Sequence, residues 1–123
     1  MERRVINPWA WQDAVGFVQA NEITGAQRVL VCSGQTSTDG DGRPVHPGDM
    51  TAQLTLALDN LETVLQESGF KLSDVVRLNT YTTDVQTFFG AWEAGVRQAS
   101  TLLGVTSLAF PKLLVEIEAT AVA

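Results

Sequence analysis

Residues 113–123 read Leu-Leu-Val-Glu-Ile-Glu-Ala-Thr-Ala-Val-Ala, an apolar run that contains two glutamates. Successive side chains of a β-strand point to opposite faces, so this run predicts a strand with one wholly hydrophobic face. Glu116 and Glu118 share its other face. A carboxylate beside apolar surface is unfavourable unless a donor, a cation or water meets it. Each glutamate is therefore expected either at a solvated rim of a sheet or beside a specific partner.

The remaining pattern predicts one α+β domain over residues 1–123, with helices on one face of a sheet. The predicted strands are residues 5–8, 14–24, 28–32, 75–83, 102–108 and 113–123, and the predicted helices are residues 50–69 and 84–97. Their order is βββαβαββ. A short turn at residues 24–27 predicts that the second and third strands form a hairpin.

Both helices carry boundary or packing signals. Asp49 is a candidate N-cap for the long helix, and Gly69 is a candidate stop after its apolar stripe. In the second helix, Phe88, Trp92 and Val96 recur at four-residue spacing, which favours a core stripe over a cofactor site. The other face of the sheet is left uncovered and partly apolar, which predicts contact with another subunit.

Composition excludes several classes of function. Fourteen acidic residues against eight basic ones give a net charge of −6, which disfavours a nucleic acid partner. The longest apolar runs are too short to span a membrane, and the start lacks a secretion signal, so a cytoplasmic protein is expected. The single cysteine, Cys32, lies in an apolar run and is expected to be buried. With one histidine, His46, no zinc site is expected.

Several local motifs together resemble the RidA family, also called the YjgF/UK114 family. The matching stretches are Val-Cys-Ser-Gly-Gln at 31–35, Leu-Asp-Asn-Leu at 58–61, the strand at 75–81, and Phe-Pro followed by Leu-Val-Glu-Ile-Glu-Ala at 110–119. The resemblance runs nearly end to end. It implies a chorismate-mutase-like fold, a homotrimer, and small-molecule ligand clefts between subunits. Active members hydrolyse reactive imines and enamines to a 2-keto acid and ammonia, with no metal or organic cofactor.

The resemblance also implies roles for individual residues. Glu116 matches the family glutamate that positions water or relays a proton, and Ser33 and Gly34 match a turn whose backbone binds the ligand. Two positions depart from the family. Ser100 stands where an arginine normally clamps the substrate carboxylate, and Phe17 stands where a tyrosine often borders the site.

The loss of the arginine changes the expected ligand. Charge-assisted hydrogen bonds are worth about 1.5–3 kcal/mol each, so the anion anchor is largely gone. With Phe17 and Trp92 nearby, the cleft is expected to favour larger, less anionic imines. The region from Phe88 to Ser100 is also shorter than in the family, and Arg97 is the nearest alternative cation.

Three functions remain open at this level. The chain is an imine or enamine deaminase with an altered substrate, a binding trimer without turnover, or a structural trimer that binds partners. In each case Glu118 is a rim or interface charge, and Arg77 is a candidate partner for it across the strands.

Overall fold

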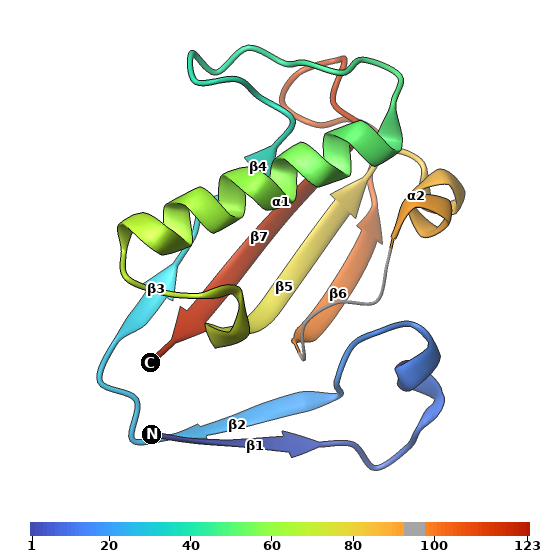
Figure 1. Cartoon of the computed structure of the whole chain (residues 1–123). Coiled ribbons are helices and arrows are strands. Elements are labelled where there is room, and N and C mark those ends of the chain that lie inside the picture. Colours follow the sequence, from blue (N-terminus) through green and yellow to red (C-terminus); the bar gives the residue numbers. More distant parts are fainter. Residues whose placement is uncertain (93–97) are drawn as a thin grey trace.

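The computed structural model describes residues 1–92 and 98–123 and contains two sheets, with helices α1 and α2 on one side of the larger one (Figure 1). The elements in chain order are β1 (Glu2–Ile6), the 3-10 helix η1 (Trp11–Ala14), β2 (Ala20–Thr24), β3 (Val29–Val31), β4 (Gln35–Thr36), α1 (Met50–Glu67), the 3-10 helix η2 (Leu72–Asp74), β5 (Val75–Thr82), α2 (Val85–Ala91), β6 (Ala99–Gly104) and β7 (Val115–Val122). Apart from β4 and the two 3-10 helices, this order is the one the sequence predicts, although β2 covers only the end of the predicted strand 14–24 and β6 begins three residues earlier than the predicted strand 102–108.

The larger sheet is mixed. Its strand order is β3-β7-β5-β6, and β4 pairs with the same edge of β7 as β3 does. Strands β5 and β6 run parallel, while the other pairs are antiparallel. The expected α+β class with a mixed sheet is therefore confirmed, and β7, the strand with the two glutamates, lies in its interior.

The predicted hairpin is wrong. Strand β2 pairs with β1 in a separate two-stranded sheet, and β3 pairs with β7 instead. Strand propensity marks both segments as extended but says nothing of their partners. Gly25, with φ 72°, permits the change of direction between the two sheets. Asn21 of β2 donates to the carbonyl of Val76 at 2.8 Å and ties the small sheet to the start of β5.

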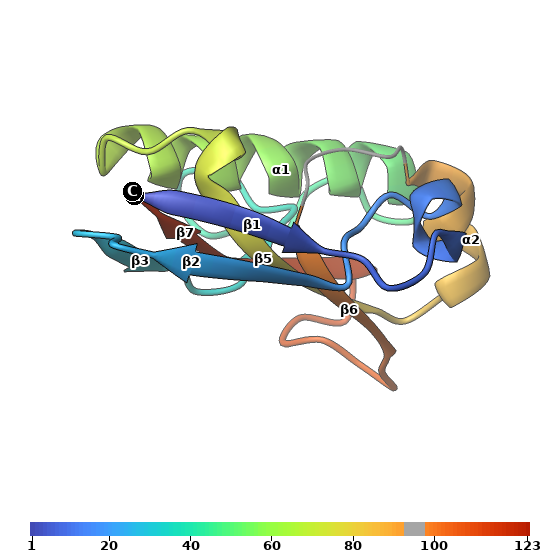
Figure 2. The ribbon, with the colours of Figure 1, turned by 90° about the horizontal axis from the view of Figure 1, so that it is seen from below.

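Helix α1 lies along one face of the large sheet and covers its hydrophobic side (Figures 1 and 2). Ile117 of β7 and Leu61 and Leu65 of α1 are at most 1% exposed. Burial of each such side chain contributes about 1.5–3 kcal/mol. Asp49 caps the helix by accepting from the backbone N–H of Ala52 at 3.0 Å, and Gly69 follows its end with φ 75°. Both boundary predictions are confirmed.

Helix α2 is shorter than predicted. Asp84 caps it, but the backbone becomes extended at Trp92, so the helix ends at Ala91 rather than near residue 97. Phe88 is buried, and its ring stacks on Trp92 with 5.5 Å between ring centroids. The core contact predicted for these two residues is confirmed. Val96 and Arg97 lie outside the described residues.

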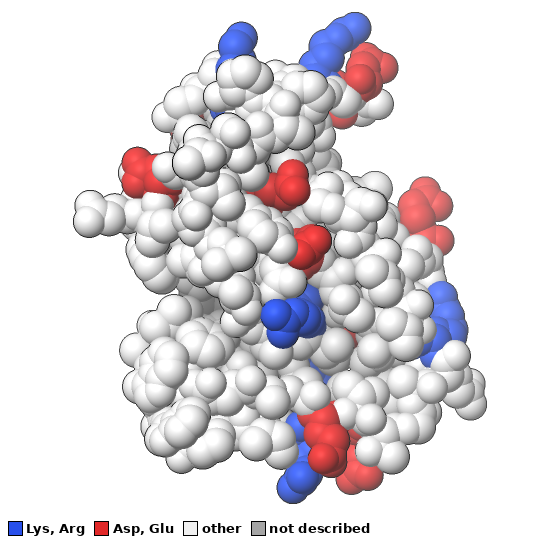
Figure 3. All heavy atoms as spheres, turned by 180° about the vertical axis from the view of Figure 1, so that it is seen from behind, with Lys and Arg blue, Asp and Glu red and all other residues white. Residues whose placement is uncertain are grey.

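No helix of the described residues covers the second face of the large sheet. We call this surface the open face; Figure 3 looks onto it and shows mainly uncharged atoms, with a few acidic and basic side chains near the middle. Val31 of β3 is 77% exposed and Leu103 of β6 is 49% exposed there. Within the described part of the chain, no helix is long and apolar enough to cross a membrane.

Candidate functional site

Glu116 lies against the turn at Ser33 and Gly34, at the edge of the open face. Strand β4 begins one residue after this turn and pairs Thr36 with Glu116, which brings the turn beside the carboxylate. A Cβ atom placed on Gly34 would lie 2.5 Å from Oε1 of Glu116 and 2.6 Å from its Cδ. Only glycine allows this close approach, so the carboxylate rests directly on exposed backbone.

The Glu116 carboxylate is half-buried and accepts no hydrogen bond from residues 1–92 or 98–123. Burial raises the pKa of Glu116, and the nearby charge of Glu118 raises it further. Such a carboxyl keeps its proton to higher pH than an ordinary glutamate. A carboxyl with a raised pKa is better suited to general acid and base catalysis than an ordinary glutamate.

Glu118 has different surroundings on the same face. Its Oε1 accepts hydrogen bonds from Nδ2 of Asn79, at 3.2 Å, and from the hydroxyl of Tyr81. The bonds from Tyr81 and Asn79 lower the pKa of Glu118, with a smaller contribution from the charge of Arg77. Among the described residues Arg77 makes no direct ion pair with Glu118, contrary to the prediction; its guanidinium donates to Oγ1 of Thr101 at 3.2 Å, and its charge acts on Glu118 without a hydrogen bond.

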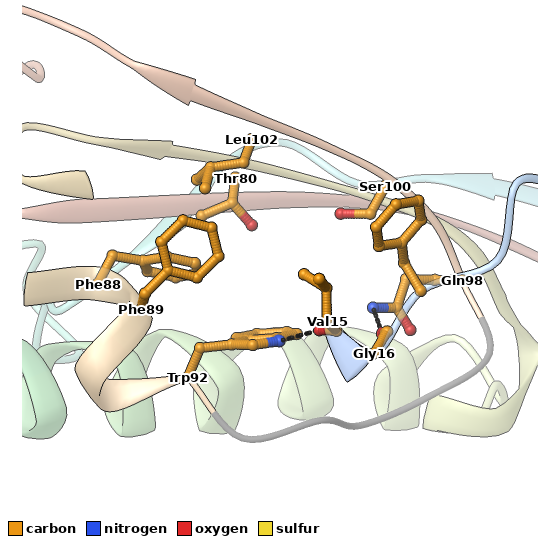
Figure 4. Close-up of a pocket in the computed structure, with 10 residues that line it drawn as sticks. Val15, Gly16, Thr80, Phe88, Phe89, Trp92, Gln98, Ser100 and Leu102 are labelled. Carbon is orange, nitrogen blue, oxygen red and sulfur yellow. Dashed lines mark hydrogen bonds between the residues drawn. The ribbon is translucent and has the colours of Figure 1, made fainter. Parts of the chain in front are cut away.

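The other three predicted site residues surround a small cavity on the helix side of the sheet. Figure 4 shows Trp92 from the end of α2, Ser100 from β6, and the segment at Val15 and Gly16 around this space. The cavity volume is about 40 Å³. The described residues that line it are Val15, Gly16, Phe17, Thr80, Phe88, Phe89, Trp92, Gln98, Ser100 and Leu102, and each of these is uncharged.

Two hydrogen bonds hold the wall of this cavity. Nε1 of Trp92 donates to the carbonyl of Val15 at 3.2 Å, and Nε2 of Gln98 donates to the carbonyl of Gly16 at 3.3 Å (Figure 4). Gln98 is fully buried, and its Oε1 has no hydrogen-bond partner among the described residues. Sequence reasoning missed this residue. A glutamine two positions before Ser100 gives no signal until the strand is paired with the segment around Gly16.

The two groups of predicted residues lie on opposite faces of the sheet. Ser100 pairs with Leu78, a core residue under the helices, so its side chain shares that side. Glu116 pairs with Tyr81, and both point to the open face. One copy of the chain therefore brings Ser33, Gly34 and Glu116 together, and separately Phe17, Trp92 and Ser100, but does not join the two groups.

The described residues do not form a cluster of candidate metal ligands. They contain no group of three or more histidine, cysteine, aspartate and glutamate side chains placed to hold an ion. Cys32 is buried, as expected, and burial raises the pKa of its thiol. This thiol therefore lacks the thiolate character that metal binding or nucleophilic attack requires.

Comparison with known proteins identifies the family. Residues 10–123 match the family model described as Endoribonuclease L-PSP. The chain belongs to this family, the RidA/YjgF family. The resemblance found in the sequence motifs is thereby confirmed.

Relatives of this RidA-family chain match it over nearly its full length. The crystal structure of YyfB from Yersinia pestis, a Rid-family protein of unknown function, is 36% identical with a TM-score of 0.87, and each chain is covered to 100%. Rv2704 from Mycobacterium tuberculosis is 32% identical with a TM-score of 0.63, covering 99% of this chain and 100% of its own. Protein DfrA from Myxococcus xanthus is 32% identical over 99% of this chain and 97% of its own length.

Proposed function

We propose that this RidA-family protein assembles as a homotrimer and hydrolyses an imine or enamine in a cleft between copies, with Glu116 as general acid and base. The contact between Gly34 and Glu116 is the observation that carries the proposal. It combines a half-buried carboxylate, free of hydrogen bonds from the described residues, with a turn of exposed backbone. A proton carrier beside backbone donors is a suitable arrangement for imine chemistry.

The opposite placement of the two residue groups supports assembly. A cleft that uses both groups needs the open face of one copy and the helix side of another. The exposed fractions of Val29, Val31 and Leu103, at 63%, 77% and 49%, also favour burial of the open face against a neighbour. A ring of identical contacts would close into a trimer with three such clefts.

The reaction requires one water molecule and no oxidant. Glu116 would give its proton to the imine, which makes the carbon more electrophilic, and would take a proton from the attacking water. Collapse of the carbinolamine then breaks the carbon–nitrogen bond and forms the carbonyl. The balanced result is imine plus water to ketone plus ammonia.

The described lining of the cavity supports a shift in substrate. Among residues 1–92 and 98–123, four aromatic rings and the short Ser100 hydroxyl line it, and none of these groups is the cation that a carboxylate-binding site needs. A volume of about 40 Å³ admits one end of a ligand, and the remainder would lie between copies. We therefore propose imines or enamines that are larger and less anionic than 2-aminoacrylate.

An imine hydrolysis assay tests this function. The protein is mixed with freshly generated 2-aminoacrylate, and in parallel with an apolar imine that lacks a carboxylate, and ammonia release is followed. We expect little acceleration for 2-aminoacrylate, clear acceleration for the apolar imine, and loss of that activity in Glu116→Gln. Glu22→Gln is the matched control, since Glu22 pairs with Arg4 on the small sheet. Fast turnover of 2-aminoacrylate would contradict the proposed role of Ser100.

A binding trimer without turnover is the second candidate, favoured by the same aromatic lining. Here ligands would raise Tm by mass action and remain unchanged. A thermal-shift screen of neutral aromatic and aliphatic compounds, followed by recovery of the bound compound, separates the two functions. RNA cleavage, which the name of the family model suggests, fits poorly with a net charge of −6 and two glutamates on the open face.

A further inference from the structure

Tyr81 connects the two glutamates of β7. The register of β5 and β7 places Tyr81 opposite Glu116 and Asn79 opposite Glu118. The Tyr81 hydroxyl nevertheless donates diagonally, to Oε1 of Glu118. Aromatic side chains reach diagonal neighbours across paired strands. Tyr81 thus lies beside one carboxylate and binds the other.

The result is an unequal pair of carboxylates. Glu118 receives two hydrogen bonds, from Tyr81 and Asn79, at the same oxygen. Glu116 receives none from the described residues and rests against Gly34. Like charges two positions apart on one face of a strand resist joint ionisation, so donors that stabilise one anion favour a proton on the other.

We propose that Tyr81 is a positioning residue that holds Glu118 as the ionised member of the pair and thereby makes Glu116 the member that carries a proton. This inference rests on the proposed function, because it explains how the general acid and base is selected. Pairs of carboxyl groups with unlike surroundings divide acid and base roles in this manner.

The electrostatics of every neighbouring element agree with this division. The pKa of Tyr81 is raised, first by its hydrogen bond to Glu118, so the phenol stays a donor across the neutral range. On β5, Arg77 adds a positive charge that favours the ionised form of Glu118. On the other side of β7, Thr36 of β4 and the turn at Gly34 contribute no charged group to Glu116.

Carboxyl titration by NMR tests the proposal on the whole protein. With ¹³C-labelled glutamate, we expect the pair to titrate in two steps. The step at lower pH should disappear in Glu118→Gln, and the step at higher pH should disappear in Glu116→Gln. In Tyr81→Phe the ring remains but the hydroxyl donor is lost. The pKa of the lower step should therefore rise, and the difference in pKa between the two steps should become smaller. The pKa of the upper step should stay above that of an ordinary glutamate, because Glu116 remains half-buried.

Two further variants make the test specific. Asn79→Ala removes the second donor and should also raise the lower step. Leu103→Ala is the matched control: Leu103 pairs with Tyr81 from β6 and binds neither carboxylate, so both steps should remain. An unchanged lower step in Tyr81→Phe, or a lower step that belongs to Glu116, would overturn the proposal.

The titration and the hydrolysis assay can fail separately. If the two steps divide as expected but no imine is hydrolysed, the role of Tyr81 stands and the proposed function is wrong. If hydrolysis occurs and Tyr81→Phe changes neither the titration nor the pH profile of kcat/KM, the role of Tyr81 is wrong.

Discussion

Gly34 and Glu116 are separated by 82 positions in the chain, yet a Cβ atom on Gly34 would lie 2.5 Å from Oε1 of Glu116. Real Cβ atoms do not approach another atom so closely. The pairing of β4 with β7 creates this contact, since it fixes the turn at Ser33 and Gly34 directly beside the glutamate. The geometry of the candidate site thus depends on one glycine.

Replacement of Gly34 by alanine should displace the Glu116 carboxylate. The clash falls on the far end of a flexible side chain, so the free energy of unfolding should fall by about 1 kcal/mol, at the low end of the cost of overpacking. The pKa of Glu116 should move down toward its ordinary range, because the carboxylate leaves its sheltered position. Carboxyl NMR and urea unfolding measure the two effects.

Gly40→Ala is the control for this substitution. A Cβ atom at Gly40 has no other atom within 4 Å, so Gly40→Ala should change neither the pKa of Glu116 nor, through a clash, the free energy of unfolding. A Gly34→Ala protein in which Glu116 still titrates at the raised pKa would show that the close contact does not shelter the carboxylate.

Local signals predicted much of the fold. The alternation in β7 and the cap and stop of α1 depend on neighbouring residues, and both are confirmed. Which strand pairs with which depends on residues distant in the sequence, so the pairing of β2 with β1 was missed. The end of α2 was missed for a similar reason. Trp92 leaves the helix where its indole donates to Val15, a contact across 77 positions.

The candidate site was likewise predicted only in the part that depends on local motifs. Glu116 and the turn at Ser33 and Gly34 follow from short motifs. The roles of Tyr81 and Asn79 need the register of β5 against β7, because only that register identifies Glu118 as their acceptor. The direct pair predicted between Arg77 and Glu118 was wrong: the register places Asn79, not Arg77, opposite Glu118, and Arg77 donates to Thr101 on the parallel neighbour β6.

An arginine at position 100 should restore recognition of a carboxylate. Ser100→Arg adds a bidentate cation to a cavity whose described lining carries no charge, which should improve binding of a carboxylate-bearing imine by about tenfold to a hundredfold. The measurement is kcat/KM for 2-aminoacrylate, or Kd for a stable 2-keto acid if turnover is absent. Thr106→Arg, in an exposed segment after β6, controls for the added charge. Equal effects of both variants would contradict a carboxylate site at Ser100.

The packing between α1 and the sheet should dominate stability. Leu65 is fully buried in the core, so Leu65→Ala should lower the free energy of unfolding by about 2–5 kcal/mol. Leu58, on the same helix, is only partly buried, and Leu58→Ala should cost clearly less. Urea unfolding should show a lower midpoint at an unchanged slope. A larger effect at Leu58 would place the main core contact elsewhere.

Stability should depend on pH through Glu116 with a defined sign. Because burial raises the folded-state pKa of Glu116 above its unfolded value, the folded protein binds more protons between those two values. The stability contributed by the protonated carboxyl is present below the unfolded pKa, about 4.3, and is lost as the pH rises through the folded pKa. Glu116→Gln removes this titration. The variant should therefore have a higher Tm than the parent at neutral pH, and the difference should shrink on acidification.

Glu118 provides the opposite case on the same strand. The folded-state pKa of Glu118 is lowered. Its contribution to folding stability is therefore present above the unfolded-state pKa and is lost as the pH falls through the folded-state pKa. Glu118→Gln should therefore have a lower Tm than the parent at neutral pH, with a difference that also shrinks in acid. Thermal unfolding of both variants across the acidic range measures the two trends. If the two substitutions change Tm in the same direction at neutral pH, the two carboxylates do not differ in the way their surroundings imply.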